Sequence, residues 1–334
     1  MKLATLSNGS RDGALAIISE DHLWALPCPE VAATMAYAIE NWTACAPRLK
    51  VRSVDLNACL ARQRIPFDIA SVRAPLPRAP QWCDGSAFLN HARLMETAFN
   101  TVPIPDLETI PLMYQGASDD FLGPFDPIVL PDEAHGIDFE GEFGVVVGDV
   151  PMGCSRAQAQ AAILLIVQLN DVSLRSFGPR EMRTGFGFVH AKPSTAFAGV
   201  AVTPDELGDA WRDCRVRLPL HVQRNGTWFG SPSGAEMNFG FDQLIMHAAA
   251  TRRLTAGTII GSGTVSNGDR GVGSACIAER RAIEIIETGS PTTAFLRFGD
   301  TVHMEATTAN GKQLFGPITQ QVKPYLSGRI ERDC

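Results

Sequence analysis

The sequence lacks several features that would place the chain in a specialised class. It has no C-x-x-C pair, no long run of like charges and no internal repeat. Its longest apolar run, 161–167, is far shorter than the roughly 20 residues that a membrane-spanning helix needs. The segment 1–13 contains no apolar stretch of the kind found in a signal peptide. We therefore expect neither a membrane protein nor a secreted one.

What is present is typical of a globular cytoplasmic protein. The chain has 334 residues, 45% of them hydrophobic and 19% charged, with a formal net charge of −7. This length accommodates one large domain and a small one. Eight cysteines are scattered along the sequence, and we expect them to be reduced and mostly buried. A net negative charge gives no reason to expect a nucleic-acid or anionic-membrane partner.

A proline-rich stretch at 65–82 predicts a boundary near residue 70. We expect a small N-terminal domain over 1–70, with short strands and a helix over 29–42. The main domain, 71–334, shows mostly strand patterns without regular strand–helix alternation. The predicted fold class is therefore α+β and β-rich.

Local signals place individual elements in the main domain. Asn225-Gly226 and Asn310-Gly311 each predict a β-hairpin, because Asn-Gly favours the tight turns that join antiparallel strands. A capping-box pattern at Ser155 opens a predicted helix that runs to residue 167. Another helix is predicted over 238–254. Further strands are predicted within three segments: 257–267, 275–286 and 292–306.

Acidic residues alternate along the segment GIDFEGEFGVVVGD, just before an apolar run. In an extended strand, Asp138, Glu140 and Glu142 share one face, and Phe139 and Phe143 share the other. One interpretation is that the acids line the solvent-facing side of an antiparallel strand. The alternative is that they converge on a hard divalent cation, which prefers several oxygen ligands.

Two other segments carry residues that suit a cation site. Asn170 and Asp171 end an apolar run, and Arg175 follows four residues later. An acid where a buried strand reaches the surface is well placed to bind a metal ion, although Asn-Asp also begins turns. In a third segment, Asp84 and His91 stand seven residues apart. A lone histidine is more often structural than catalytic.

Taken together, these segments resemble the fumarylacetoacetate hydrolase family. The resemblance runs in order through most of residues 81–320, and it is carried by seven motifs: DGSAFLNH, PLMYQGASDDFLGP, DFEGEFGVVVG, NDVSLR, HAKPSTAF, GSGTVSN and ACIAERR. It implies a β-roll catalytic domain behind a small N-terminal β domain. It also implies a homodimer.

The resemblance further implies a metal site with four ligands: Asp84, Glu140, Glu142 and Asp171. This set is all oxygen and all anionic. It suits Mg²⁺ or Ca²⁺, with Mn²⁺ as a further candidate, and does not suit a tetrahedral zinc site. Asp138 is then interpreted as a structural acid outside the ligand set.

For catalysis, the resemblance implies that His91 is the catalytic histidine. Its partner carboxylate is predicted to be Glu279, with Glu284 as the alternative. Lys192 matches a lysine near the metal, and Arg175 matches an arginine that helps to hold the reacting oxygens. Contacts to the substrate are implied for three residues: Tyr114, Lys192 and Thr264, the last at the carboxylate end of the substrate.

The chain departs from the family pattern at three positions. Ser86, Asn100 and Gly178 stand where the family carries a tyrosine, an arginine and a glutamine. His190 is a candidate replacement for the missing polar group. Because these positions hold the far end of the substrate and the leaving group, the particular substrate stays open.

The resulting hypothesis is hydrolysis of a carbon–carbon bond in a 1,3-diketo acid such as fumarylacetoacetate or an acylpyruvate. Aromatic or tyrosine breakdown is the corresponding pathway at family level. His91 would activate water against a metal-chelated carbonyl. The alternatives are an isomerase or decarboxylase of a 2-oxo acid ring-fission product on the same site, or a non-catalytic metal- or ligand-binding relative. The sequence leaves the substrate, the native metal and the pathway open.

Overall fold

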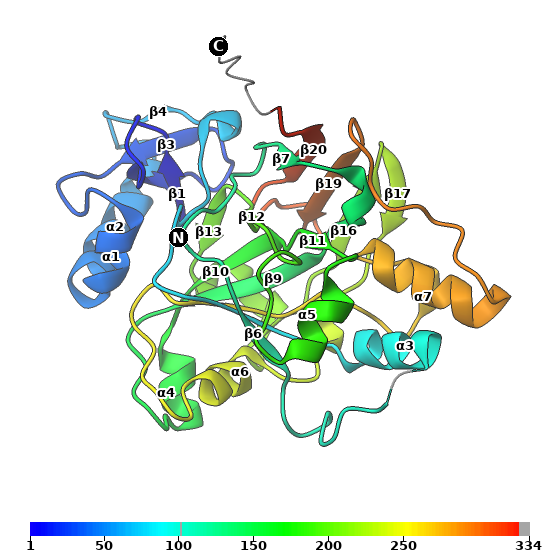
Figure 1. The fold of residues 1–334 in the computed structure, drawn as a ribbon. Coiled ribbons are helices and arrows are strands. Elements are labelled where there is room, and N and C mark those ends of the chain that lie inside the picture. The colour runs from blue at the N-terminus through cyan, green and yellow to red at the C-terminus, as the bar shows by residue number, and fades with distance from the viewer. Residues whose placement is uncertain (101, 327–334) are drawn as a thin grey trace, which may run out of the picture.

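The computed structural model describes residues 1–100 and 102–326. Within these ranges, the chain forms an eleven-stranded sheet, a five-stranded sheet and two short two-stranded ribbons, with α-helices around them (Figure 1). The α+β, β-rich class predicted from the sequence is confirmed.

The large sheet carries or directly adjoins the four predicted metal ligands. Its strands follow the order β4 (Ile65–Pro66), β3 (Trp24–Pro27), β2 (Ala14–Ile18), β1 (Lys2–Leu6), β13 (Val200–Val202), β10 (Ile163–Asn170), β9 (Gly141–Val147), β18 (Ile259–Gly261), β5 (Trp82–Gly85) and β6 (Met113–Gly116), with β12 (Ala196–Phe197) paired to β10. Neighbours are antiparallel except β18 and β5. Every residue of β9 and β10 is buried, which explains why both strands are apolar along most of their length.

The five-stranded sheet packs against the same core. Its order is β17 (Thr227–Gly230), β16 (Leu220–Arg224), β19 (Thr301–Ala306), β20 (Ile318–Pro324) and β7 (Ile128–Leu130). The ribbons pair β8 (Ile137–Asp138) with β11 (Ser173–Leu174), and β14 (Trp211–Arg212) with β15 (Arg215–Val216). Val222 and Met304 of the smaller sheet share one hydrophobic cluster with Phe143 of β9, so the two sheets bury a common interior.

Helices cover the outside of the sheets. They are α1 (Met35–Glu40), α2 (Trp42–Asn57), α3 (Leu89–Phe99), α4 (Arg156–Ala161), α5 (Gly178–Thr184), α6 (Phe241–Ala248) and α7 (Ile277–Thr288). Short 3₁₀ turns occur at Ile69–Ser71, Glu133–His135, Pro204–Ala210, Gly234–Glu236 and Arg270–Val272. In Figure 1, α3 and α7 lie side by side, as do α4 and α6, and contacts join each pair. Among the described helices, none combines the length and apolar character needed to cross a membrane.

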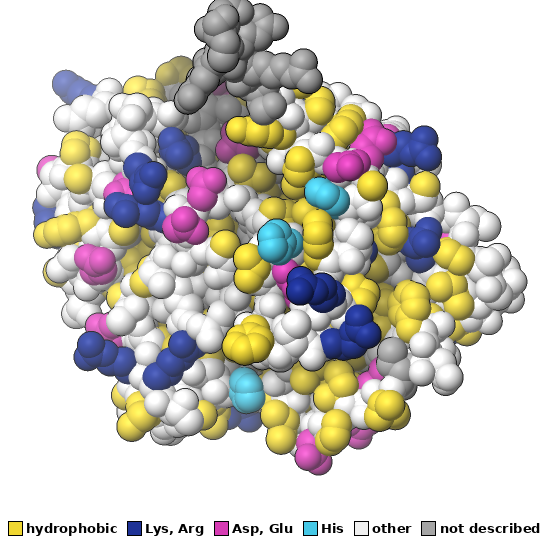
Figure 2. Space-filling view, viewed as in Figure 1, with side chains coloured by type: hydrophobic (Ala, Val, Ile, Leu, Met, Phe, Trp, Pro, Cys, Tyr) yellow, Lys and Arg dark blue, Asp and Glu magenta, His cyan; other side chains and the backbone are white. Residues whose placement is uncertain are grey.

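The face drawn in Figure 2 carries lysine, arginine, aspartate and glutamate side chains interspersed with apolar ones. Neither sign of charge forms a dominant patch on that face. Of the cysteines, the seven within the described residues are free and six of them are buried, as expected. Cys334 lies outside the described residues.

The predicted turns and strands have mixed outcomes. Asn225-Gly226 joins β16 to the antiparallel β17, as predicted, with positive φ at both turn residues. Asn310-Gly311 does not join two strands, because β19 ends at Ala306 and a single bridge links Thr307 to Gln313. The segments 257–267 and 292–306, both predicted to contain strands, each contain one, β18 in the first and β19 in the second, and both strands are shorter than the predicted segments.

The predicted helices are present but have different limits. The helix expected over 29–42 begins only after Thr34, whose side chain caps α1, and α2 then continues to Asn57. The Ser155 capping box is confirmed, but α4 ends at Ala161 and the apolar residues that follow form β10. The helix expected over 238–254 is the shorter α6.

The prediction of a strand over 275–286 is wrong, because these residues form most of α7. Isoleucine-rich patterns favour strands locally, but a distant residue stabilises the helix start. The Asp138 carboxylate accepts the backbone N–H groups of Ile277 and Ala278, at 2.8 and 2.9 Å. Capping from another segment is invisible in the local sequence.

Candidate metal centre

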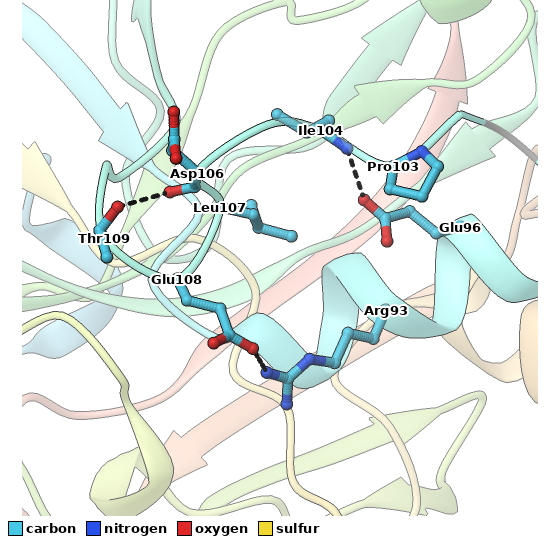
Figure 3. Close-up of a pocket in the computed structure, with 8 residues that line it drawn as sticks. All are labelled: Arg93, Glu96, Pro103, Ile104, Asp106, Leu107, Glu108 and Thr109. Carbon is cyan, nitrogen blue, oxygen red and sulfur yellow. Dashed lines mark hydrogen bonds and ion pairs between the residues drawn. The ribbon is translucent and has the colours of Figure 1, made fainter.

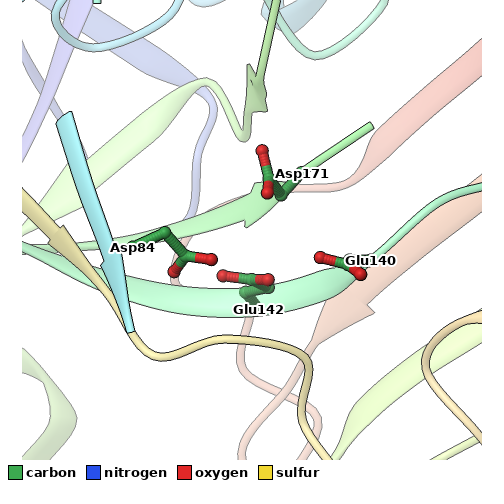
Figure 4. Close-up of side chains that lie close together, drawn as sticks. All are labelled: Asp84, Glu140, Glu142 and Asp171. Carbon is green, nitrogen blue, oxygen red and sulfur yellow. The ribbon is translucent and has the colours of Figure 1, made fainter. Parts of the chain in front are cut away.

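Four carboxylates from three distant segments converge in the structure (Figure 4). Asp84 lies on β5, Glu142 on β9, Glu140 just before β9, and Asp171 just after β10. One oxygen atom of each side chain lies within 4.8 Å of the corresponding atoms of the other three.

Strand pairing explains how these acids meet. β9 pairs on one side with β10, where Glu142 is aligned with Leu169, two residues before Asp171. On the other side β9 pairs with β18, whose Gly261 is also aligned with Asp84 of β5. The registers of three strand pairs therefore fix the carboxylates on rigid elements.

The acids are buried, with relative exposures of 3%, 5%, 0% and 0% for Asp84, Glu140, Glu142 and Asp171. The interpretation that the alternating acids line a solvent-facing strand is therefore wrong. Burying a carboxylate is costly unless another group compensates its charge.

Glu140 and Asp171 are compensated by side chains of the chain itself. The Lys192 ammonium donates hydrogen bonds to both of them, each at 2.6 Å. Arg175 donates to the second oxygen of Glu140 at 2.6 Å, and the Tyr114 hydroxyl donates to Asp171 at 2.6 Å. Burial raises the pKa of Glu140, but Lys192, Arg175 and then His91 outweigh it and lower that pKa below its ordinary value.

Asp84 and Glu142 lack such compensation. Within the described residues neither forms an ion pair, and neither carboxylate oxygen of Glu142 has a hydrogen-bond partner. Burial, and then the charge of Asp171, raises the pKa of Asp84 well above its ordinary value. Burial, and then the charge of Asp84, does the same to the pKa of Glu142.

A divalent cation would supply the missing positive charge. Mg²⁺, Mn²⁺ and Ca²⁺ bind oxygen ligands at about 2.0–2.6 Å, so ligand atoms around one ion lie up to about 5 Å apart. The four carboxylates meet this limit, and the two oxygens of Glu142 that have no partner face no competing donor. The residues present therefore fit a hard divalent ion.

Asp138 is bonded elsewhere. Besides capping α7, it accepts a hydrogen bond from Arg175 at 2.8 Å, and Arg175 links it to Glu140. This arrangement agrees with its interpretation as a structural acid that holds the arginine and the start of α7.

A histidine–carboxylate pair forms where α3 and α7 pack together. His91 Nδ1 lies 2.8 Å from Glu279 Oε2, and the Glu279 side chain is 1% exposed. Glu284, the alternative partner, instead accepts hydrogen bonds from the backbone of Thr292 and Thr293. The structure thus pairs His91 with the first of the two predicted carboxylates.

Of the three residues predicted to contact the substrate, Tyr114 and Lys192 lie close to each other, and Thr264 lies in another segment. The Tyr114 ring packs edge-on against Phe188, with centroids 5.0 Å apart, and Lys192 Nζ lies 5.4 Å from the Tyr114 ring centroid. Thr264 is buried in the segment after β18. Its contact with substrate stays a prediction, as does a role for the largely exposed His190 ring.

The three positions that depart from the family pattern lie on different elements. Ser86 follows β5, Asn100 ends α3 and Gly178 begins α5. Their effect on substrate choice stays a prediction.

Several residues that orient the acids were missed by sequence reasoning. Thr195 donates to Asp171 at 2.8 Å, and the Asn170 side chain accepts the Glu140 N–H at 3.1 Å. The backbone N–H of Gly263 donates to Asp84 at 3.0 Å. The only signal in the sequence that could have identified these residues is that they lie within the quoted motifs.

A hollow of about 410 Å³ lies between α3 and the segment 103–109 (Figure 3). An ion pair joins Arg93 to Glu108 across it, and Glu96 accepts the Ile104 N–H at 3.2 Å. None of the predicted metal ligands lines this hollow, so it is separate from the acidic cluster.

The comparisons with known proteins agree with this geometry. Residues 81–323 match the family model described as fumarylacetoacetate (FAA) hydrolase C-terminal, and residues 1–78 match fumarylacetoacetase N-terminal domain 2. The chain belongs to the fumarylacetoacetate hydrolase family. The division at residue 70 stays a prediction.

Individual relatives differ in activity. A 2,4-didehydro-3-deoxy-L-rhamnonate hydrolase from Sphingomonas sp. (strain SKA58) is 29% identical over 229 residues, which are 68% of each chain. A mitochondrial oxaloacetate tautomerase from Bos taurus is 26% identical over 204 residues, 60% of each chain. The solved structure of maleylpyruvate hydrolase from Sphingobium sp. SYK-6, in complex with manganese(II) and pyruvate, has a TM-score of 0.62 at 16% identity. This match covers 98% of the present chain and all of the other.

The close approach at Gly261 generates a prediction. A Cβ atom there would lie 2.2 Å from Asp84 Oδ1 and 2.3 Å from the Trp82 ring. Gly261→Ala is therefore expected to displace Asp84, to cost about 1–3 kcal/mol of stability and to weaken divalent-ion binding. Thermal unfolding and calorimetric titration with Mn²⁺ measure both effects.

Gly268→Ala is the control, because the nearest atom to a Cβ there is 3.8 Å away. Equal Mn²⁺ affinity and melting temperature in the two variants would show that the close approach does not set the position of Asp84.

The raised pKa values of Asp84 and Glu142 generate a pH-dependence prediction. Their ordinary values are 3.8 and 4.5, so the folded metal-free protein retains protons that the unfolded chain releases. Their contribution to stability is full below pH 3.8 and is lost as the pH rises through the raised values. A divalent ion takes the place of those protons, so it should raise the melting temperature more at about pH 8 than at about pH 5.5.

Thermal unfolding with EDTA or with Mn²⁺ at the two pH values checks this expectation. A stabilisation by Mn²⁺ that is equal at both pH values would contradict it.

Proposed function

We propose that the protein is a divalent-metal-dependent hydrolase that cleaves a carbon–carbon bond in a 1,3-diketo acid such as fumarylacetoacetate or an acylpyruvate. The observation that carries the proposal is the pair of the partly exposed His91 with the buried Glu279, in a protein that also holds the four-carboxylate cluster. A metal platform alone serves several reactions of 2-oxo acids, whereas hydrolysis also needs a positioned base for water.

The metal site accounts for substrate binding and polarisation. A divalent cation held by the four acids would act as a Lewis acid toward the carbonyl and orient the diketo acid. The manganese and pyruvate in the maleylpyruvate hydrolase support this class of ion and ligand. Mg²⁺, Mn²⁺ and Ca²⁺ all suit the donor set, and the native metal is part of the proposal.

His91 is the proposed general base. In the tautomer that carries its proton on Nδ1, His91 would donate to Glu279, and Nε2 would be free to accept a proton from water. The buried carboxylate then stabilises the imidazolium that forms, as in other histidine–carboxylate pairs. The water oxygen adds to the carbonyl carbon, the carbon–carbon bond breaks, and the departing carbon fragment takes back the proton.

Lys192 and Arg175 are proposed to stabilise negative charge that develops on the reacting oxygens. Burial lowers the pKa of Lys192, but Asp171 and Glu140 outweigh it, so the ammonium stays charged. A preorganised donor of this kind typically contributes about 3–4 kcal/mol to the transition state. Tyr114 and Thr264 are proposed to contact the substrate.

The second candidate is an isomerase, tautomerase or decarboxylase of a 2-oxo acid. It is supported by the 26% identity to an oxaloacetate tautomerase. In an isomerisation or tautomerisation His91 would transfer a proton to or from carbon without adding water, and in a decarboxylation it would return a proton to the carbon that loses CO₂. We also propose a homodimer, which the family resemblance supports, and a cytoplasmic location, which the free cysteines among the described residues support.

Product analysis tests the proposed function. Purified protein with Mg²⁺ or Mn²⁺ is incubated with fumarylacetoacetate, several acylpyruvates and oxaloacetate. Hydrolysis yields two organic fragments, decarboxylation yields CO₂, and tautomerisation changes only the spectrum. Hydrolytic turnover is the expected result, whereas an enol–keto conversion without fragments would contradict hydrolysis.

His91→Ala is expected to reduce hydrolysis by about 10²–10⁴-fold, the usual contribution of general-base catalysis, while divalent-ion affinity is kept. Glu279→Gln should give a smaller loss, because the imidazole remains but its orientation is less fixed. Steady-state kinetics and Mn²⁺ titration measure the two effects. His247→Ala, on the exposed side of α6, is the control, and wild-type turnover in His91→Ala would place the base elsewhere.

A further inference from the structure

Glu181 binds the segment that leads directly into Lys192. Its carboxylate, on α5, accepts the backbone N–H groups of Val189, His190 and Ala191 at 3.1, 2.9 and 3.1 Å. The His190 ring adds a further contact at 3.2 Å. A single carboxylate therefore fixes three successive residues before Lys192.

The opposite side of this segment is also held. The carbonyl of Ala191 accepts the N–H of Leu174 on β11, at 2.8 Å. Ala191 is thus bonded through its N–H to α5 and through its C=O to β11, and its side chain is buried. This leaves the backbone little freedom at the residue before Lys192.

The preceding part of the loop is much less constrained. Phe186 is 96% exposed, and Gly185 and Gly187 adopt positive φ in open space, with no atom within 4 Å of where a Cβ atom would lie. The contacts that tie this loop to other elements therefore lie at Phe188 and at the three residues that Glu181 binds. Phe188, between these two parts, packs against the Tyr114 ring.

The Glu181 carboxyl group is ionised over the whole neutral pH range, so its hydrogen bonds do not depend on pH there. Burial raises the pKa of its carboxyl, but the three backbone N–H groups outweigh burial and lower that pKa to about 2. The carboxylate stays ionised at neutral pH, when charged hydrogen bonds to it are strongest.

We propose that Glu181 is a positioning residue for Lys192, holding the loop so that the ammonium reaches Glu140 and Asp171 at the metal centre. Lys192 Nζ lies 2.6 Å from both acids, and its side chain is only 10% exposed. The proposal rests on the role of Lys192 in the proposed function. Glu181 itself contacts none of the four acids within hydrogen-bonding distance.

Glu181→Gln tests this role with little change in volume. An amide has one accepting oxygen and one donating nitrogen, so at least one backbone N–H of the loop loses its partner. A displacement of about 1 Å at a reacting group can cost on the order of 10²-fold in rate. We expect kcat to fall by about that factor, with a smaller change in KM.

Glu284→Gln is the matched control. Glu284 also lies on a helix and accepts two backbone N–H groups from the loop that follows, at 2.6 and 2.9 Å, but that loop does not lead to the metal centre. The control should lose the same kind of hydrogen bond and keep wild-type kcat.

Chemical labelling gives a readout that needs no substrate. The lysines are Lys2, Lys50, Lys192, Lys312 and Lys323. An amine-reactive reagent followed by mass spectrometry reports each separately, and Lys50, with a 71% exposed side chain, is the internal reference. Relative to Lys50, labelling of Lys192 should rise about tenfold in Glu181→Gln, the factor that a loss of 1.4 kcal/mol of protection gives.

The outcomes separate this proposal from the proposed function. Unchanged Lys192 labelling in folded Glu181→Gln would overturn the positioning role, whatever the enzyme hydrolyses. Increased labelling in a protein that hydrolyses none of the diketo acids would support the positioning role and reject the function.

If the variant does not fold, amide exchange in the wild-type protein decides, with slower exchange expected at 189–191 than at 186–187. Equal exchange across the loop would contradict the proposal.

Discussion

Two buried carboxylates without a positive partner impose the main constraint on this structure. Asp84 and Glu142 lie beside Glu140 and Asp171, whose charges are already offset by Lys192. A protein interior does not tolerate such charges unless they are protonated or bind a cation. Because the site is built from four oxygen-bearing acids, a hard divalent ion is the complement that satisfies it.

The four acids are positioned by strands, whereas the groups proposed to act on the substrate are positioned by helices and loops. Strand registers fix the acids, because Gly261 of β18 is aligned with Asp84 and β9 lies between β10 and β18. The groups proposed for proton transfer and charge stabilisation lie on helices and loops outside the sheet. His91 depends on the packing of α3 against α7, and Lys192 depends on a loop held from α5. Such a division would allow the reaction to change through the helices and loops while the acids keep their positions.

The sequence predicted the site better than it predicted the elements around it. The alternating acids alone left two interpretations open, and the set of four carboxylates followed from the family resemblance that the short motifs carry. The helix α7, Ile277–Thr288, was predicted as a strand, because the capping of its first turn by Asp138, far away in the sequence, cannot be read from the local pattern. The hydrogen bonds from Gly263, Thr195 and Glu181 depend on strand register and loop path, which local patterns do not specify. The change from helix to strand after Ala161 likewise follows from burial in the sheet.

The most direct measurement is anomalous X-ray diffraction from crystals grown with Mn²⁺. We expect one strong anomalous peak about 2.0–2.4 Å from oxygens of Asp84, Glu140, Glu142 and Asp171. Both oxygens of Glu142 should then be oriented by the ion, in place of having no partner. The absence of a peak among these acids at millimolar Mn²⁺, or a peak bound only by surface carboxylates, would contradict the metal centre on which the proposed chemistry depends.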